Sequence, residues 1–110
     1  SDAGRAVFMT SGLAHKCWAY WGPYSISKAA LEAMVKTYAA EIATTAIRAN
    51  CFSPGATRTH MRASAMPGED PMSLPHPDEV AAQIIAMCEP DFDDNGGVWK
   101  YDPKGLFKQF

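Results

Sequence analysis

Two short apolar runs, separated by a long alanine-rich stretch, constrain the fold of this chain more than any other feature. The first run is Arg5–Thr10, and the second is Ile47–Ser53, which Pro54 and Gly55 close. Between them, residues 22–43 carry apolar side chains at helical spacing: Ala30, Leu31, Met34, Val35, Tyr38 and Ile42. A long helix is the usual connection between two parallel strands. The pattern therefore predicts a strand–helix–strand unit in a sheet that helices cover on both faces.

The rest of the chain continues this alternation. A polar, proline-marked stretch from about Ala56 to Pro75 indicates a long loop, which in a compact domain is more often a functional lid than filler. A helix is predicted to begin at residues 76–77 and to stop at Pro90, and Val98–Tyr101 indicates a third strand. Residues beyond 101 carry no strong pattern. The sequence thus predicts one α/β domain over residues 1–110, with a parallel sheet of three strands.

A tyrosine and a lysine in the predicted first helix form a candidate reactive pair. Tyr24 and Lys28 are four residues apart, so a phenol and an ammonium lie one above the other on one helix face. A positive charge beside a phenol favours the phenolate, which makes the pair a usable proton donor and acceptor. Ser11 follows the first apolar run, where a strand end would bring its hydroxyl to the same place. Such a pair by itself is more commonly an exposed surface pair, so the neighbouring motifs decide its interpretation.

These residues and the motifs around them resemble the short-chain dehydrogenase/reductase family. Twelve residues separate Ser11 from Tyr24 and three separate Tyr24 from Lys28, which matches the catalytic signature of the family. The first apolar run is similar to the family's fifth strand, and the second run, with its Pro-Gly exit, is similar to the sixth. Residues 54–59 match the pattern P-G-x-x-x-T. The resemblance extends to about Tyr101 and implies a partial Rossmann-like, doubly wound parallel sheet that holds the family's last three strands.

The resemblance also implies an activity. The family transfers hydride between a nicotinamide cofactor, NAD or NADP, and a carbonyl compound or secondary alcohol. Tyr24 is implied to exchange a proton with the substrate oxygen, Lys28 to assist it, and Ser11 to orient and polarise the carbonyl. Thr57 stands where the family often has Val or Ile, which binds the cofactor through its backbone. The implied cofactor-binding residues are Tyr24, Lys28, Pro54, Gly55, Thr57 and Thr59, and no residue is implied as a metal ligand.

One motif of the family is missing from these 110 residues, namely the G-x-x-x-G-x-G turn that binds the cofactor phosphates. The residue that selects NAD or NADP and the asparagine of the proton relay are missing too. The chain is therefore expected to be the C-terminal half of such an enzyme, whether by truncation, by proteolysis or as a short gene, and to be inactive alone. Because its first strand would have an unpaired edge, we expect it to associate with a second copy or with a separate N-terminal half.

A second interpretation is a catalytically inactive interaction module. The alanine-rich helix and the last helix and strand resemble surfaces through which the family forms oligomers. An aromatic stretch before Tyr24 fits either interpretation, because its side chains could pack in a core or subunit contact, or line a substrate pocket. These residues are His15, Trp18, Tyr20 and Trp21.

Composition and charge argue against several other classes of function. The net charge of −2 and the pI near 5.8 give no electrostatic case for nucleic acid or an anionic membrane, and no apolar run approaches the roughly 20 residues of a membrane span. The three cysteines are widely spaced and odd in number. We therefore expect no disulfide framework, a small buried residue at each position, and a cytoplasmic protein. Residues 91–96 resemble the start of a calcium-binding loop. Calcium binding is not expected, because Val98–Tyr101 indicates a strand.

Overall fold

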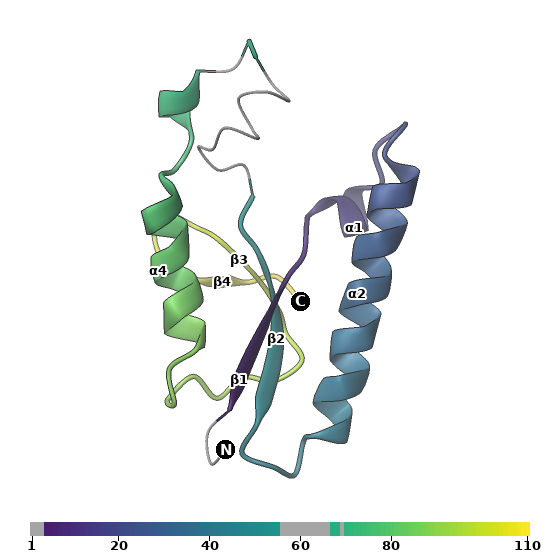
Figure 1. Ribbon diagram of the computed structural model, residues 1–110, viewed down its shortest axis with the longest axis vertical. Helices are drawn as coiled ribbons and strands as arrows, with labels where there is room; N and C mark the ends of the chain where they lie inside the picture. The colour runs from purple at the N-terminus through teal and green to yellow at the C-terminus, as the bar shows by residue number, and fades with distance from the viewer. Residues whose placement is uncertain (1–3, 56–66, 69) are drawn as a thin grey trace.

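A computed structural model describes residues 4–55, 67–68 and 70–110, and Figure 1 shows a sheet with α2 on one side and α4 on the other. Among these residues, no helix is both long and apolar enough to cross a membrane. The elements, in chain order, are β1 (Arg5–Met9), α1 (Leu13–Lys16), α2 (Gly22–Glu41), β2 (Arg48–Ser53), the 3-10 turn η1 (Pro71–Ser73), α4 (Pro77–Met87), β3 (Val98–Lys100) and β4 (Phe107–Lys108).

The sheet confirms the predicted parallel arrangement and adds one strand. Its order is β1-β2-β3-β4, and the first three strands are parallel. Met9 lies opposite Phe52, so β1 and β2 end at the same edge of the sheet. β4 runs antiparallel to β3 and pairs Lys108 with Trp99. The sequence did not reveal β4, because a strand of two residues is too short to show an alternating pattern.

The sheet separates two apolar clusters, one beneath α2 and one beneath α4. Alternate residues of β2 point to opposite faces, so Cys51 joins the first cluster and Phe52 the second. The buried members of the first are Val35, Ile42, Ala49, Cys51 and Val98, and those of the second are Phe52, Val80 and Met87. The apolar face predicted for α2 was partly wrong, because Met34 is 53% and Tyr38 38% exposed. Helical spacing alone does not distinguish the buried edge of a broad apolar face from the exposed edge.

Both long helices begin where the sequence predicts. Pro23 lies in the first turn of α2, where the missing N–H of proline costs nothing. His76 caps α4, because its Nδ1 accepts the backbone N–H of Asp78 at 3.1 Å. Asp78 and Glu79 follow in the first turn, where a negative charge is favourable. The expectation that His76 begins a helix is therefore confirmed.

The acidic turn after α4, over residues 91–97, is held by contacts within the protein. Asn95 Oδ1 accepts the backbone N–H of Ala49, and Asn95 Nδ2 donates to the carbonyl of Ala39, both at 2.9 Å. Asp94 accepts from the ammonium of Lys108 at 2.9 Å. Within the described ranges, no group of three or more His, Cys, Asp or Glu side chains is placed to hold a metal ion. The polar side chains of this turn thus anchor it to α2 and to the sheet.

The three cysteines differ in exposure, which corrects one expectation from the sequence. Cys17 and Cys88 are exposed, whereas Cys51 is 1% exposed in the core. Burial raises the pKa of the Cys51 thiol from 9.0 to about 11, and the negative charge of Glu32 adds to the effect while Lys36 opposes it. Cys51 therefore carries a neutral and shielded thiol at physiological pH.

We expect a thiol reagent at neutral pH to modify Cys17 and Cys88 rapidly and Cys51 only after unfolding. Mass spectrometry of the native and the urea-unfolded protein checks this result. Since the folded state holds the Cys51 proton more tightly, its stability should fall as pH rises from 9.0 to about 11. Cys51→Ala should remove that part of the slope. Rapid native labelling of Cys51 would show that the core is more open than described.

Candidate active site

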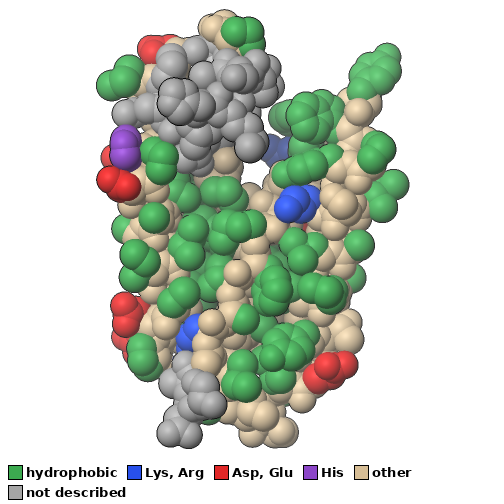
Figure 2. All heavy atoms as spheres, in the orientation of Figure 1, with side chains coloured by type: hydrophobic (Ala, Val, Ile, Leu, Met, Phe, Trp, Pro, Cys, Tyr) green, Lys and Arg blue, Asp and Glu red, His purple; other side chains and the backbone are tan. Residues whose placement is uncertain are grey.

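The three residues predicted to be catalytic lie at one end of the sheet. Ser11 follows β1, and Tyr24 and Lys28 lie in the first two turns of α2. Figure 1 shows the start of α2, the helix α1 and the carboxyl ends of β1 and β2 at the same, upper end of the molecule. In the same orientation, Figure 2 shows the surface hollowed beside the start of α2. The segment after β1 and the first turns of α2 therefore place Ser11, Tyr24 and Lys28 at the same end of the molecule.

Lys28 contacts both Tyr24 and the end of β1. Its Nζ lies 5.7 Å from the centroid of the Tyr24 ring and donates to the carbonyl of Met9 at 3.3 Å. Tyr24 is 41% exposed and packs edge-on against Trp21 at 6.0 Å between ring centroids. The predicted helix geometry therefore does bring the ammonium beside an accessible phenol.

Ser11 lies in a tight turn between β1 and α1. Its Oγ accepts the backbone N–H of Leu13 at 3.2 Å, and its carbonyl accepts that of Ala14 at 3.1 Å. The side chain is half-buried. A hydroxyl that accepts one hydrogen bond still has its own proton to donate. Ser11 can thus act as a fixed donor toward a ligand oxygen.

Pro54 and Gly55 leave β2 at the same edge of the sheet. Because Met9 lies opposite Phe52, Ser11 and Pro54 each lie two residues beyond this matched pair. Gly55 has a φ of +69°, which glycine adopts without strain, and among the described residues no atom outside its chain neighbours lies within 4 Å of the position that a Cβ would take there. The predicted cofactor residues Thr57 and Thr59 lie outside the described residues, as does most of the predicted lid over 56–75.

The aromatic stretch between Ser11 and Tyr24 does not belong to the core of the described chain. Trp18 is 54%, Tyr20 103% and Trp21 45% exposed. A packing role in the core is therefore wrong for these three residues. Lining a substrate pocket and packing against a partner both stay predictions.

A buried carboxylate beside the site was missed by the sequence reasoning. Glu32 is 3% exposed and contacts the hydroxyl of Thr10 and the imidazole of His15. A sequence signal did exist, because Glu32 lies four residues after Lys28 and thus on the face of α2 that carries Tyr24. The sequence alone does not predict its burial, because a charged residue in an amphipathic helix normally faces solvent.

The chemistry of this end of the sheet fits the nicotinamide half of a dinucleotide. The ammonium of Lys28 and the hydroxyl of Tyr24 can bond to ribose hydroxyls, and Gly55 has no side chain to block the approach of a flat ring. The family's glycine-rich turn, which binds the cofactor phosphates, does not occur in these 110 residues. Tyr24, Lys28 and Ser11 thus bring a phenol, an ammonium and a hydroxyl to this end of the sheet, and the roles assigned to them stay predictions.

Comparisons with known proteins agree with this description. The model of a family described as enoyl-(acyl carrier protein) reductase matches residues 1–92. The uncharacterized oxidoreductase YciK of Escherichia coli is 46% identical over 91 residues, which cover 83% of this chain and 36% of that protein. Dehydrogenase/reductase SDR family member 4 of Rattus norvegicus is 40% identical over 57 residues, which cover 52% of this chain and 20% of that protein.

Solved structures give the same result. A short-chain dehydrogenase from Salmonella enterica superposes with a TM-score of 0.82 at 38% identity, covering 94% of this chain and 43% of that one. A short-chain dehydrogenase from Escherichia coli complexed with NADPH superposes with a TM-score of 0.80 at 39% identity, and the match covers 94% of this chain and 43% of that one. The chain thus spans less than half the length of the relatives reported above.

Proposed function

Since the chain belongs to the short-chain dehydrogenase/reductase family, we propose that the complete product of its gene is an NAD(P)-dependent oxidoreductase. Its substrate is a small carbonyl compound or the corresponding secondary alcohol. One observation carries the proposal, namely the ammonium of Lys28 at 5.7 Å from the ring of Tyr24, at the end of the sheet where Ser11 follows β1. A bound nicotinamide cofactor supplies or accepts the hydride.

Each of the three side chains has a separate task in carbonyl reduction. Tyr24 donates the proton of its hydroxyl to the substrate oxygen as that oxygen gains negative charge. Lys28 stabilises the phenolate that remains, because its positive charge is held beside the ring. Ser11 donates a hydrogen bond to the same oxygen and fixes the orientation of the carbonyl. In alcohol oxidation the proton moves in the opposite direction, and the phenolate of Tyr24 accepts it from the substrate hydroxyl.

Cofactor binding is proposed to use the residues around the end of β2. Lys28 and Tyr24 bind the ribose, the backbone at Pro54 and Gly55 borders the nicotinamide, and Thr57 and Thr59 complete the contacts. NADPH is the first cofactor to test, because one structural relative is described as complexed with NADPH and another as complexed with NADP.

Three free cysteines support a cytoplasmic location for the protein.

The decisive experiment measures consumption of NADPH and NADH by the complete gene product with a panel of aldehydes and ketones. Carbonyl-dependent consumption is expected, whereas none with any substrate and either cofactor would contradict the proposal. The 110-residue chain assayed alone should be inactive and should bind NADPH weakly, because it lacks the glycine-rich turn. Strong quenching of its tryptophan fluorescence by NADPH would show that phosphate binding resides elsewhere in the chain.

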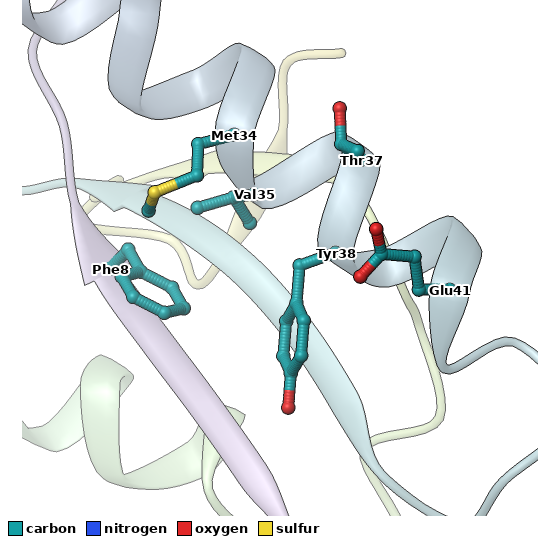
Figure 3. Close-up of a pocket in the computed structure, with 6 residues that line it drawn as sticks. All are labelled: Phe8, Met34, Val35, Thr37, Tyr38 and Glu41. Carbon is teal, nitrogen blue, oxygen red and sulfur yellow. The ribbon is translucent and has the colours of Figure 1, made fainter.

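A second candidate function is association with another chain. An open apolar depression of about 460 Å³ lies between β1 and α2, and Figure 3 shows the ring of Phe8 facing Met34 and Val35 across it. Met34 and Tyr38 on its rim are exposed apolar side chains, and β1 is an edge strand of the described sheet. These features support pairing with a second copy or with a separate N-terminal half. Light scattering on the 110-residue chain should give a mass above the 11.9 kDa of one chain.

A further inference from the structure

Glu32 is a carboxylate in the interior of the chain, beside the proposed catalytic residues. Its side chain is 5% exposed, and it lies on the helix face of Tyr24 and Lys28, one turn beyond Lys28. A carboxylate that leaves water loses its hydration, so it is retained only where the protein supplies hydrogen bonds. Its partners therefore show what it holds in place.

The two partners of Glu32 lie on either side of Ser11 in the sequence. Thr10, which immediately precedes Ser11, donates its hydroxyl proton to Oε2 of Glu32. His15, in α1, lies with its Nε2 2.8 Å from Oε1 of Glu32. One side chain of α2 thus ties down both flanks of the turn that carries the Ser11 hydroxyl.

Neighbouring contacts leave this turn little freedom. Lys28 donates to the carbonyl of Met9 at 3.3 Å, one residue before Thr10. On the other flank, the ring of His15 stacks on Phe110 at 4.3 Å between centroids and an angle of 27°. Thr10 itself is 4% exposed. Side chains of the helix that carries Tyr24 therefore hold the segment from Met9 to His15, together with contacts to Phe52 and Phe110.

We propose that Glu32 is a positioning residue that fixes the Ser11 hydroxyl relative to the Tyr24 phenol, by binding Thr10 and His15. The inference rests on the proposed function, because Ser11 and Tyr24 must meet the same substrate oxygen. Glu32 acts through its partners and does not touch the reacting atoms. A misplacement of about 1 Å at a catalytic group lowers a rate by about 100-fold. The contacts of Glu32 with Thr10 and His15 should therefore raise kcat by keeping the Ser11 hydroxyl in position.

The test replaces Glu32 in the complete gene product and compares kcat with KM. Glu32→Ala removes both hydrogen bonds and should lower kcat by roughly 10- to 100-fold, with the KM for NADPH changed by less than about twofold. Glu32→Gln keeps the shape and one carbonyl oxygen, so it should restore part of the lost kcat. Glu89→Gln makes the same chemical change at an exposed position and should leave kcat unchanged.

A second variant and a second measurement guard against misfolding of Glu32→Ala. Thr10→Val replaces the hydroxyl by a methyl group and should also lower kcat. Its effect should be less than additive with that of Glu32→Gln, because both changes act on one contact. Hydrogen exchange reports the turn directly, since the N–H of Leu13 donates to Ser11 Oγ. Exchange of the Leu13 amide hydrogen should become faster by roughly 10-fold in Glu32→Gln and Thr10→Val, while amides within α2 keep their protection.

The outcomes separate the two proposals. Normal kcat in Glu32→Ala and Thr10→Val would overturn the positioning role and leave the oxidoreductase proposal intact. The same conclusion would follow if the KM for NADPH rose by as large a factor as kcat fell, because that would indicate general disruption of the site. If the unmodified gene product transfers no hydride, the oxidoreductase proposal fails. Leu13 exchange then decides whether Glu32 holds the Ser11 turn, and unchanged exchange in both variants refutes it.

Discussion

Replacing Tyr24 by phenylalanine is expected to lower kcat for carbonyl reduction by roughly 100- to 10,000-fold, which is the usual contribution of a general acid. The variant loses only the hydroxyl that would donate a proton to the substrate oxygen. Lys28 keeps its contact with the ring, because a phenylalanine ring also attracts a cation. Steady-state kinetics of the complete gene product, with NADPH consumption as the signal, measures the effect.

The structure offers a matched control for this variant. Tyr101→Phe also removes a tyrosine hydroxyl, but on the α4 side of the sheet, where the Tyr101 hydroxyl donates to Glu79 at 3.4 Å. That variant should keep its kcat, and both should melt within a few degrees of the unmodified protein, because Tyr24 is 41% exposed. Near-normal turnover in Tyr24→Phe would refute the assigned role of the phenol, and another proton donor would then have to be sought.

The largest loss of stability is expected for Phe52→Ala. Phe52 is fully buried in β2 and packs in the cluster beneath α4 with Val80 and Met87. Removing such a ring leaves a cavity and costs about 3–5 kcal/mol. A domain of this size has about 5–15 kcal/mol in total and is expected near the lower limit. Urea unfolding, followed by circular dichroism, should show a much lower midpoint or no folded baseline.

Phe107→Ala provides the comparison for this prediction. Phe107 is 51% exposed in β4, so its removal creates no cavity and should cost less than about 1 kcal/mol. If both variants unfold at the same urea concentration, the cluster beneath α4 contributes little to stability. The assignment of Phe52 to the centre of that cluster would then be wrong.

Much of the fold could be predicted because its signals are local. The run Arg5–Thr10, the helical spacing before Ile42 and the Pro54-Gly55 exit each act within a few residues. They predicted β1, α2 and β2 to within a few residues at each end. The short helix α1 and the strand β4 were missed, since four residues and two residues carry too little periodicity to be distinguished from loops.

The candidate site divides in the same way. Tyr24 and Lys28 were paired from sequence, because residues four apart meet on any α-helix, and the contact at 5.7 Å confirms that pairing. The functional roles assigned to them stay predictions, as do those of Thr57 and Thr59. Glu32 was missed because its burial follows from Thr10 and His15, which approach it from another element.

The sequence by itself therefore determined the strand–helix–strand unit, the family and the phenol–ammonium pair. All three depend on spacing along the chain, which helix and strand geometry converts directly into contacts. Only the tertiary structure decided which edge of the α2 face is buried and that Glu32 anchors the turn of Ser11. Those outcomes depend on contacts between residues far apart in the chain, such as Thr10 and Glu32, and no local pattern encodes which distant partner a side chain will meet.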